Sequence, residues 1–137
     1  MKRLSILCLA LITFISAACQ PKPVTGETVN APGGSYKNVS ANELAAMLKN
    51  KDFIFVNVHI PFVGDIAETD LSIPYDQIDQ NLSQLPADKN AKIVLYCRSG
   101  RMSQIAAEKL ASLGYTNIWN LKDGMVGWEQ AGFDIKK

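Results

Sequence analysis

Residues 93–103 read IVLYCRSGRMS, and this stretch decides the fold. Its first four residues are apolar, as in a buried strand, and Cys97 follows at the strand's end. A short polar loop containing Gly100 comes next, and a helix is predicted to begin directly after it. This order directs the Cys97 thiol toward backbone N–H groups at a helix N-terminus, where thiolates and anions are stabilised. The stretch predicts a nucleophilic cysteine beside an anion site, suited to sulfur or phosphoryl transfer.

The rest of the chain alternates between predicted strands and helices. The expected strands are 36–39, 53–58, 71–73, 93–96 and 117–121. The expected helices are one capped by Ser40 and Glu43, one running from about Met102 to Leu113, and one over 125–130, with a short helix or turn over 75–85. Alternation of this kind predicts an α/β fold with a mainly parallel central sheet and helices on both faces. Ligands of such sheets bind beyond the carboxyl ends of the strands, where Cys97 falls.

The N-terminus has the features of an export signal. A positive segment, residues 1–3, precedes the apolar residues 4–15, and the small residues 16–18 follow. The apolar run is shorter than the roughly 20 residues of a membrane-spanning helix. We therefore interpret residues 1–18 as a signal peptide; a permanent N-terminal anchor is the alternative.

Cys19 directly follows the predicted cleavage site and resembles the lipidated cysteine of bacterial lipoproteins. Lipid on Cys19 would insert into a bilayer and hold the protein at the cell envelope. Ser16 departs from the lipoprotein pattern, and soluble secretion is the alternative. The Pro/Gly-rich residues 19–35 are predicted to form a flexible tether, and residues 36–137 the folded domain.

Charge and cysteine content exclude several classes of function. Removal of residues 1–18 takes away Lys2 and Arg3, leaving 12 cationic against 13 acidic side chains, so no basic surface for nucleic acid is expected. With Cys8 in the signal and Cys19 lipidated, Cys97 would be the only free thiol, and no structural disulfide is expected. No metal or cofactor is expected either. We interpret the acids near the single histidine as a solvated loop: Asp65, Glu68, Asp70 and Asp76.

Residues 36–135 resemble the single-domain rhodanese-like sulfurtransferases. The loop CRSGR, residues 97–101, is similar to the family's active-site loop, and LKDGMVGW, residues 121–128, is similar to its closing motif. NVH at residues 57–59 stands where the family has Asp-Val-Arg. Residues 64–74, which begin Gly-Asp-Ile and end Ile-Pro, stand where the family has a segment that begins Gly-His-Ile and ends Ile-Pro.

The resemblance implies a reaction in which Cys97 attacks the outer sulfur of a small anionic donor such as thiosulfate. A Cys97 persulfide would form and pass its sulfur to a thiol acceptor. The loop residues supply what this chemistry needs. Gly100 allows close backbone approach. Arg98 and Arg101 supply positive charge for the anionic sulfur donor. Ser99 and Ser103 can donate hydrogen bonds through their hydroxyl groups.

Two positions depart from the family pattern. Met102 stands where the family commonly has arginine or a small polar residue. The lack of an arginine argues against phosphatase chemistry, because the related phosphatases hold phosphate with an arginine at the end of the loop. Met102 either packs inward or lines the substrate site. His59 either lies near Cys97 as its base or counter-ion, or is a loop residue that replaces a structural arginine. We assign Trp119 and Trp128 to the core.

Two further hypotheses come from these departures and from the cysteine itself. The first is a rhodanese fold that acts as a binding or sensing module without catalysis. The second is thiol redox chemistry at Cys97, which the lack of a neighbouring resolving thiol makes weak.

Overall fold

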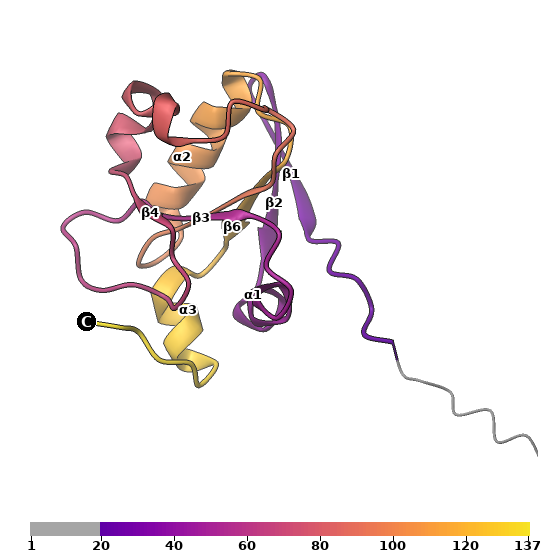
Figure 1. Cartoon of the computed structure of the whole chain (residues 1–137), viewed down its shortest axis with the longest axis vertical. Coiled ribbons are helices and arrows are strands. Elements are labelled where there is room, and N and C mark those ends of the chain that lie inside the picture. Colours follow the sequence, from indigo (N-terminus) through magenta and orange to yellow (C-terminus); the bar gives the residue numbers. More distant parts are fainter. Residues whose placement is uncertain (1–19) are drawn as a thin grey trace, which may run out of the picture.

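The computed structural model describes residues 20–137, so the predicted signal peptide 1–18 and the predicted lipidation site Cys19 lie outside the described residues. Within residues 20–137, no helix combines the length and the apolar character that a membrane crossing requires. Figure 1 shows helices packed around one central sheet, with the first described residues leading away from it.

The described residues form a six-stranded sheet in the order β1-β2-β6-β5-β3-β4. The strands are β1 (Glu27–Ala31), β2 (Gly34–Val39), β3 (Ile54–Asn57), β4 (Leu71–Ser72), β5 (Ile93–Tyr96) and β6 (Ile118–Leu121). Every pairing is parallel except that of β1 with β2, which is antiparallel. The predicted α/β fold with a mainly parallel sheet is confirmed.

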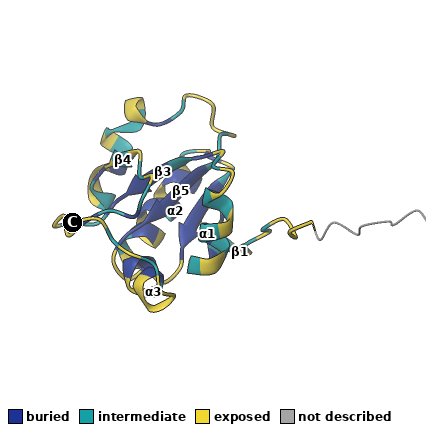
Figure 2. Cartoon of the chain, turned by 60° about the horizontal axis from the view of Figure 1, so that its bottom comes forward, coloured by how far each residue is buried: buried dark blue, intermediate teal, exposed yellow. Residues whose placement is uncertain are grey.

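Helices cover both faces of the sheet, as predicted. They are α1 (Ala41–Leu48), α2 (Arg101–Ser112) and α3 (Gly124–Gln130), with the 3-10 helices η1 (Tyr75–Gln80) and η2 (Leu82–Gln84). One hydrophobic cluster joins the sheet to α2 and η1 through Leu110 and Ile78. The other joins the opposite face to α1 and α3 through Leu44 and Trp128. Figure 2 shows the buried strands between more exposed helices.

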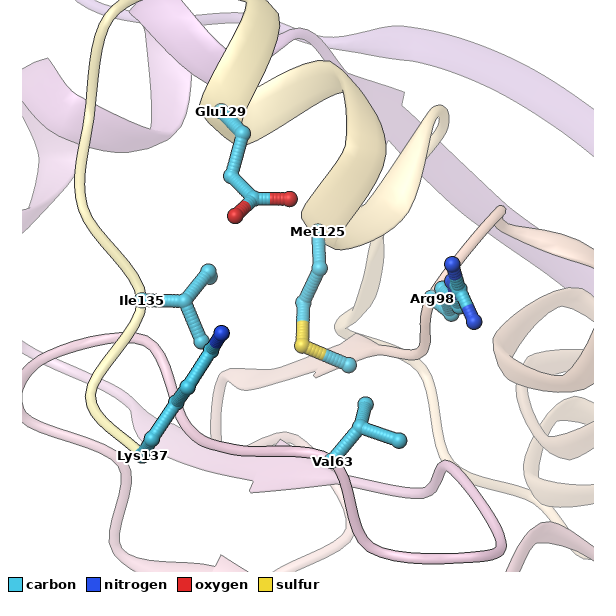
Figure 3. A pocket seen from close by; sticks show the side chains of 6 residues that line it. All are labelled: Val63, Arg98, Met125, Glu129, Ile135 and Lys137. Carbon is cyan, nitrogen blue, oxygen red and sulfur yellow. The ribbon is translucent and has the colours of Figure 1, made fainter.

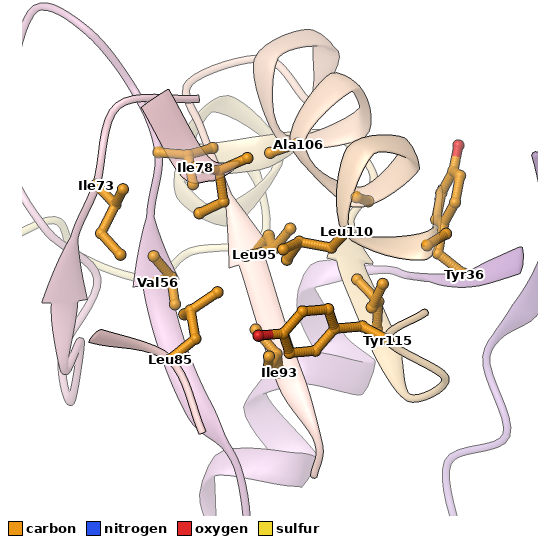
Figure 4. Close-up of a cluster of buried hydrophobic side chains, with 14 of the residues drawn as sticks. Tyr36, Val56, Ile73, Ile78, Leu85, Ile93, Leu95, Ala106, Leu110 and Tyr115 are labelled. Carbon is orange, nitrogen blue, oxygen red and sulfur yellow. The ribbon is translucent and has the colours of Figure 1, made fainter. Parts of the chain in front are cut away.

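The fully buried strand β5 divides its side chains between these two clusters. Ile93 and Leu95 belong to the α2 face, and Val94 and Tyr96 to the opposite face. Figure 4 shows Leu95 beside Leu110 of α2, and Ile93 beside Tyr115, which follows α2. Because side chains of a strand alternate between faces, Cys97 continues the first set and joins the α2 cluster. The strand period therefore directs the thiol toward the start of α2.

The predicted capping box at the start of α1 is confirmed. The Glu43 N–H donates to Ser40 Oγ at 3.3 Å, and the Ser40 N–H donates to Glu43 Oε2 at 2.8 Å. These bonds satisfy N–H groups that lack partners inside the helix. Leu44 is fully buried beneath the helix, whereas Met47 and Leu48 are only partly buried.

Strand β1 corrects the prediction of a flexible tether over residues 19–35. Residues 27–31 form a strand that pairs with β2, with Val29 opposite Tyr36. Residues 32 and 33 connect the two strands, and β2 already begins at Gly34. Residues 27–31 show little hydrophobic periodicity because β1 is an edge strand whose apolar residues are only partly buried. Backbone pairing with β2, rather than burial of side chains, holds residues 27–31 in place.

Candidate active site

Cys97 lies directly beyond the carboxyl end of β5, the position that ligand sites of parallel sheets occupy. Its side chain is only 1% exposed. Among the described residues Cys97 is the only cysteine, and its thiol is free. A buried thiol in this position can react only with a group that enters the loop around it.

The start of α2 supplies hydrogen-bond donors to the thiol. The Gly100 N–H donates to Cys97 Sγ at 3.0 Å. The Ser103 hydroxyl lies 3.4 Å from Sγ and 3.1 Å from the Gly100 carbonyl oxygen, so its one hydrogen can serve either acceptor. Of the predicted backbone N–H groups, only that of Gly100 donates to Sγ among the described residues, and the Ser103 hydroxyl lies beside it. Ser99 is exposed and makes no side-chain hydrogen bond to Sγ within the described part of the chain.

Glycine is required at position 100 for two reasons. Its φ is +96°, a left-handed conformation that side chains with a Cβ adopt at a cost. A Cβ at this position would also overlap the carbonyl oxygen of Lys122, at the end of β6. The loop thus turns tightly against the β6–α3 connection, which brings the Gly100 amide onto the thiol.

Helix α3 holds the cysteine loop from the other side. The Met125 N–H donates to the Cys97 carbonyl oxygen, and the Val126 N–H to that of Arg98, both at 2.9 Å. In a trans peptide the N–H points opposite to the C=O. The N–H groups of Arg98 and Ser99 are therefore directed away from α3. Sequence reasoning placed the closing motif by resemblance but did not foresee this contact.

Arg98 and Arg101 bring positive charge to the loop. Both side chains are exposed, and neither takes part in the ion pairs formed by the described residues. An exposed guanidinium without a carboxylate partner is free to bind an anion with its several N–H donors. The pair therefore suits capture of an anionic substrate beside Cys97.

Met102 is half-buried and packs against the hydrophobic cluster on the α2 face. The sequence left open whether Met102 packs inward or lines the substrate site, and this contact agrees with inward packing. Both tryptophans belong to the cluster on the opposite face, and each is 5% exposed, which confirms their assignment to the core. Their indole N–H groups donate to Asn117 Oδ1 and to the Asp134 carbonyl oxygen.

His59 follows β3, which pairs with β5, so the histidine lies at the same edge of the sheet as Cys97. Its backbone N–H donates to Asn57 Oδ1 at 3.0 Å, whereas its buried Nδ1 has no hydrogen-bond partner among the described residues. Burial lowers the pKa of His59, and the positive charge of Arg98 lowers it further. Both effects favour the neutral form of the imidazole.

A buried polar network supports the loop after β3. The Tyr96 hydroxyl accepts from the Ile66 N–H and lies 3.0 Å from Asp65 Oδ1, which also accepts from Asn57 at 2.8 Å. Burial is the main cause that raises the pKa of Tyr96 far above its usual value, so the hydroxyl stays neutral. Asp70 Oδ2 likewise accepts hydrogen bonds from the Phe55 N–H and from Lys51 Nζ. These acids support the fold around the site.

A cavity of about 300 Å³ lies beside the cysteine loop. Its lining comes from the loop after β3, the cysteine loop, α3 and the C-terminal segment, and consists of Val63, Arg98, Met125, Glu129, Ile135 and Lys137 (Figure 3). Cys97 is not part of the lining, but its neighbour Arg98 is. Sequence reasoning missed this cavity because its walls are far apart along the chain.

The family model for the rhodanese-like domain matches residues 49–131, which include the cysteine loop and all of α3. The chain belongs to the rhodanese-like family. A sulfurtransferase from Allochromatium vinosum is 32% identical over 89 residues, covering 62% of this chain and 79% of that protein. A rhodanese-like domain protein from Staphylococcus aureus has a similar structure, with a TM-score of 0.61, 30% identity and coverage of 74% of this chain and 99% of that one.

Other relatives of this rhodanese-like chain are longer proteins. The chain spans 55% of an uncharacterized Synechocystis protein that is 33% identical over 101 residues, 72% of this chain. It spans 31% of a tRNA uridine(34) hydroxylase from Erwinia tasmaniensis, at 29% identity over 75% of this chain. At the level of the family, the relatives support a sulfurtransferase-type activity.

Proposed function

We propose that this rhodanese-like domain moves sulfane sulfur from a small anionic donor such as thiosulfate to a thiol acceptor through a Cys97 persulfide. The observation that carries the proposal is the Gly100 N–H on Cys97 Sγ at 3.0 Å. Arg98 and Arg101 lie beside it, exposed and without an ion-pair partner among residues 20–137. A backbone donor aimed at sulfur stabilises negative charge on the thiolate and on the persulfide.

In the first half-reaction the Cys97 thiolate attacks the outer sulfur of thiosulfate. The sulfur–sulfur bond of the donor breaks, and sulfite leaves with its electron pair. In the second half-reaction an acceptor thiolate attacks the outer sulfur of the persulfide, and Cys97 leaves as the thiolate. The enzyme is restored without any external oxidant or reductant, as ping-pong chemistry requires.

The mass of the intact domain tests the first step. Incubation of residues 20–137 with thiosulfate, followed by removal of excess donor, is expected to add one sulfur atom, and cyanide is expected to remove it. Cys97→Ala should gain nothing. A wild-type domain without the added sulfur, or an equal gain in Cys97→Ala, would rule the proposal out.

A binding or sensing module without catalysis is the second candidate. It is favoured by the 1% exposure of Cys97 and by the inward packing of Met102 where the family commonly has arginine. Complementation of a deletion strain separates the two: a Cys97→Ser protein restores the phenotype if the domain only binds. Loss of complementation by a folded Cys97→Ser protein supports catalysis.

We also propose that the protein is exported and anchored to the cell envelope through lipid on Cys19. Residues 21–24 line a cavity with Asp52 and Lys92, which precede β3 and β5, at the end of the sheet opposite Cys97. An anchor attached there would leave the active-site edge accessible. Partition of the full-length protein into detergent should be lost in Cys19→Ala. Equal partition of both proteins into the aqueous phase would instead favour soluble secretion.

A further inference from the structure

The first described residues, 20–26, already lie against the domain. Residues 21–23 line a cavity together with residues of α1, and Val24 packs against the hydrophobic cluster on the α1 face. A Cβ at Gly26 would come within 2.9 Å of the Trp119 ring. Figure 1 shows these residues entering on the side of the molecule away from the C-terminus. Little free chain therefore separates the domain from the residue that precedes Gln20.

The length of this chain limits how far the domain can stand from a bilayer. Cys19 precedes Pro21 by two positions, and Pro21 already lines the cavity. Two fully extended residues span about 7 Å. Lipid on Cys19 would therefore hold this side of the domain within about one Debye length of the headgroups, which is roughly 8 Å at physiological ionic strength. Charges on this side would act directly on the bilayer surface.

Three lysines on this side have no carboxylate partner. Lys22 lines the cavity, and Lys49 ends α1 directly before Asn50, which also lines it. Lys37 Nζ lies 4.8 Å from the centre of the ring of Trp119, another lining residue. None of the three lysines belongs to an ion pair among residues 20–137. We call the surface formed by Lys22, Lys37 and Lys49 the lysine face.

Two acids on the same side are each paired with a different lysine. Asp52, which lines the cavity, accepts hydrogen bonds from Lys92 Nζ on both carboxylate oxygens at 3.0 Å. Asp70 accepts from Lys51 Nζ at 2.6 Å. Because these carboxylates are already engaged, they leave the charges of the lysine face available to an anion.

The cavity itself combines cationic and apolar walls. Its volume is about 350 Å³, which lies within the range of small-ligand sites. A phosphodiester can bind the ammonium group of Lys22, while Met47 and Trp119 can contact the carbons attached to it. Residues 21–24, 46 and 47 of the lining precede residues 49–131, which the family model matches. This part of the cavity therefore lies outside the rhodanese-like match.

We propose that the lysine face rests on a bilayer and that its cavity binds the headgroup of an anionic phospholipid. The proposal rests on the lipid anchor at Cys19 proposed above. The anchor would supply hydrophobic attachment, and the lysines would add electrostatic attraction to the anionic surface. Cys97 lies beyond the carboxyl end of β5, whereas Lys92 precedes that strand. This orientation directs the cysteine loop toward the aqueous phase.

Lysine acetylation on vesicles tests the orientation. The full-length lipidated protein is reconstituted into vesicles of phosphatidylcholine alone, or of phosphatidylcholine and phosphatidylglycerol in equal amounts. A water-soluble reagent then acetylates exposed amines, and mass spectrometry follows each lysine. Phosphatidylglycerol should slow acetylation of Lys22 and Lys49 about fivefold, and high salt should abolish the difference. Lys136, beside the loop after β3, should react equally in both vesicles. Equal rates for Lys22 and Lys49 in both vesicles would overturn the proposal.

Two matched variants locate the contact on the surface. Residues 20–137, without the anchor, are sedimented with vesicles that contain phosphatidylglycerol. Lys49→Gln should lower the partition coefficient about fivefold. Lys136→Gln removes the same charge from another exposed lysine that forms no ion pair among residues 20–137, and should leave partition unchanged. Equal losses in the two variants would show attraction by net charge alone and would contradict the lysine face.

The outcome separates from that of the anchor. If the full-length protein floats with phosphatidylcholine vesicles but Lys22 and Lys49 stay unprotected on phosphatidylglycerol, the anchor stands and the lysine face is rejected. If the full-length protein does not float with phosphatidylcholine vesicles, the anchor fails, and sedimentation of residues 20–137 decides. Salt-sensitive binding that Lys49→Gln weakens supports the lysine face, and no binding to phosphatidylglycerol rejects it.

Discussion

The N–H of Met125 donates to the carbonyl oxygen of Cys97 at 2.9 Å. This bond joins the first turn of α3 to the nucleophile's own backbone, across 27 intervening residues. It satisfies an N–H group that has no partner within α3, and it fixes the direction of the Cys97–Arg98 peptide. The donors around the thiol therefore depend on where α3 sits.

Substitution of Gly124 should disrupt this relationship. Gly124 has φ of +58°, and a Cβ there would overlap the carbonyl oxygens of Cys97 and Arg98. We expect Gly124→Ala to lower the free energy of unfolding by about 3 kcal/mol and to abolish persulfide formation. Gly132→Ala is the control, because Gly132 has φ of +91° but no atoms near its Cβ position. Its cost should be about 1 kcal/mol in urea unfolding, with sulfur loading retained. Equal effects of the two variants would contradict the overlap.

Ser103 is expected to matter for reactivity. Its buried hydroxyl lies 3.4 Å from Cys97 Sγ, so Ser103→Ala removes one of the two donors that contact the sulfur. We expect persulfide formation to slow about tenfold, measured by mass against time. Ser112→Ala removes a hydroxyl of the same helix that, among residues 20–137, bonds only the Lys109 carbonyl oxygen, and should load at the wild-type rate. A Ser103→Ala rate equal to that of Ser112→Ala would show that the hydroxyl serves Gly100 alone.

Tyr96→Phe should destabilise the domain. The substitution leaves the buried Ile66 N–H without its acceptor and removes one partner of Asp65. The expected loss is about 1–3 kcal/mol in urea unfolding. Tyr115→Phe is the matched control, since Tyr115 is 5% exposed and its hydroxyl makes no hydrogen bond within residues 20–137. A similar small loss for both variants would argue against the network's role.

The titration of His59 should report its surroundings. His59 is the single histidine, so its NMR signal needs no separation from others. Burial first, and then the charge of Arg98, lower its pKa, so the midpoint should fall below the usual value of 6.5. Arg98→Gln removes the second cause and should raise the midpoint without restoring it fully. A midpoint at or above 6.5 in the wild type would contradict this environment.

The lowered pKa of His59 also determines how its contribution to the free energy of unfolding changes with pH. Between the lowered pKa and 6.5 the unfolded chain binds more protons than the folded one. The contribution of His59 is therefore complete above pH 6.5 and is lost as pH falls through the folded-state pKa. Urea unfolding at several pH values should show this loss in the wild type and a flatter profile in His59→Asn. An unchanged profile in His59→Asn would assign the acid dependence to other groups.

Local patterns in the sequence predicted much of the site. The apolar run before Cys97, the glycine after it and the helical spacing that follows identified strand β5, the loop and α2. The Ser40–Glu43 capping box was also predictable, because its bonds join residues three apart. Edge strand β1 was not, since its order depends on pairing with β2 rather than on burial.

The sequence by itself determined that a cysteine would end a buried strand and face a helix N-terminus, because strand alternation and helix starts are set by neighbouring residues. Only the tertiary structure decided what surrounds that cysteine. The α3 amides on the loop and the bridge between Asp65 and Lys136 join residues far apart along the chain. Such contacts follow from strand order and helix placement, which bring Arg98, Glu129 and Lys137 to one cavity.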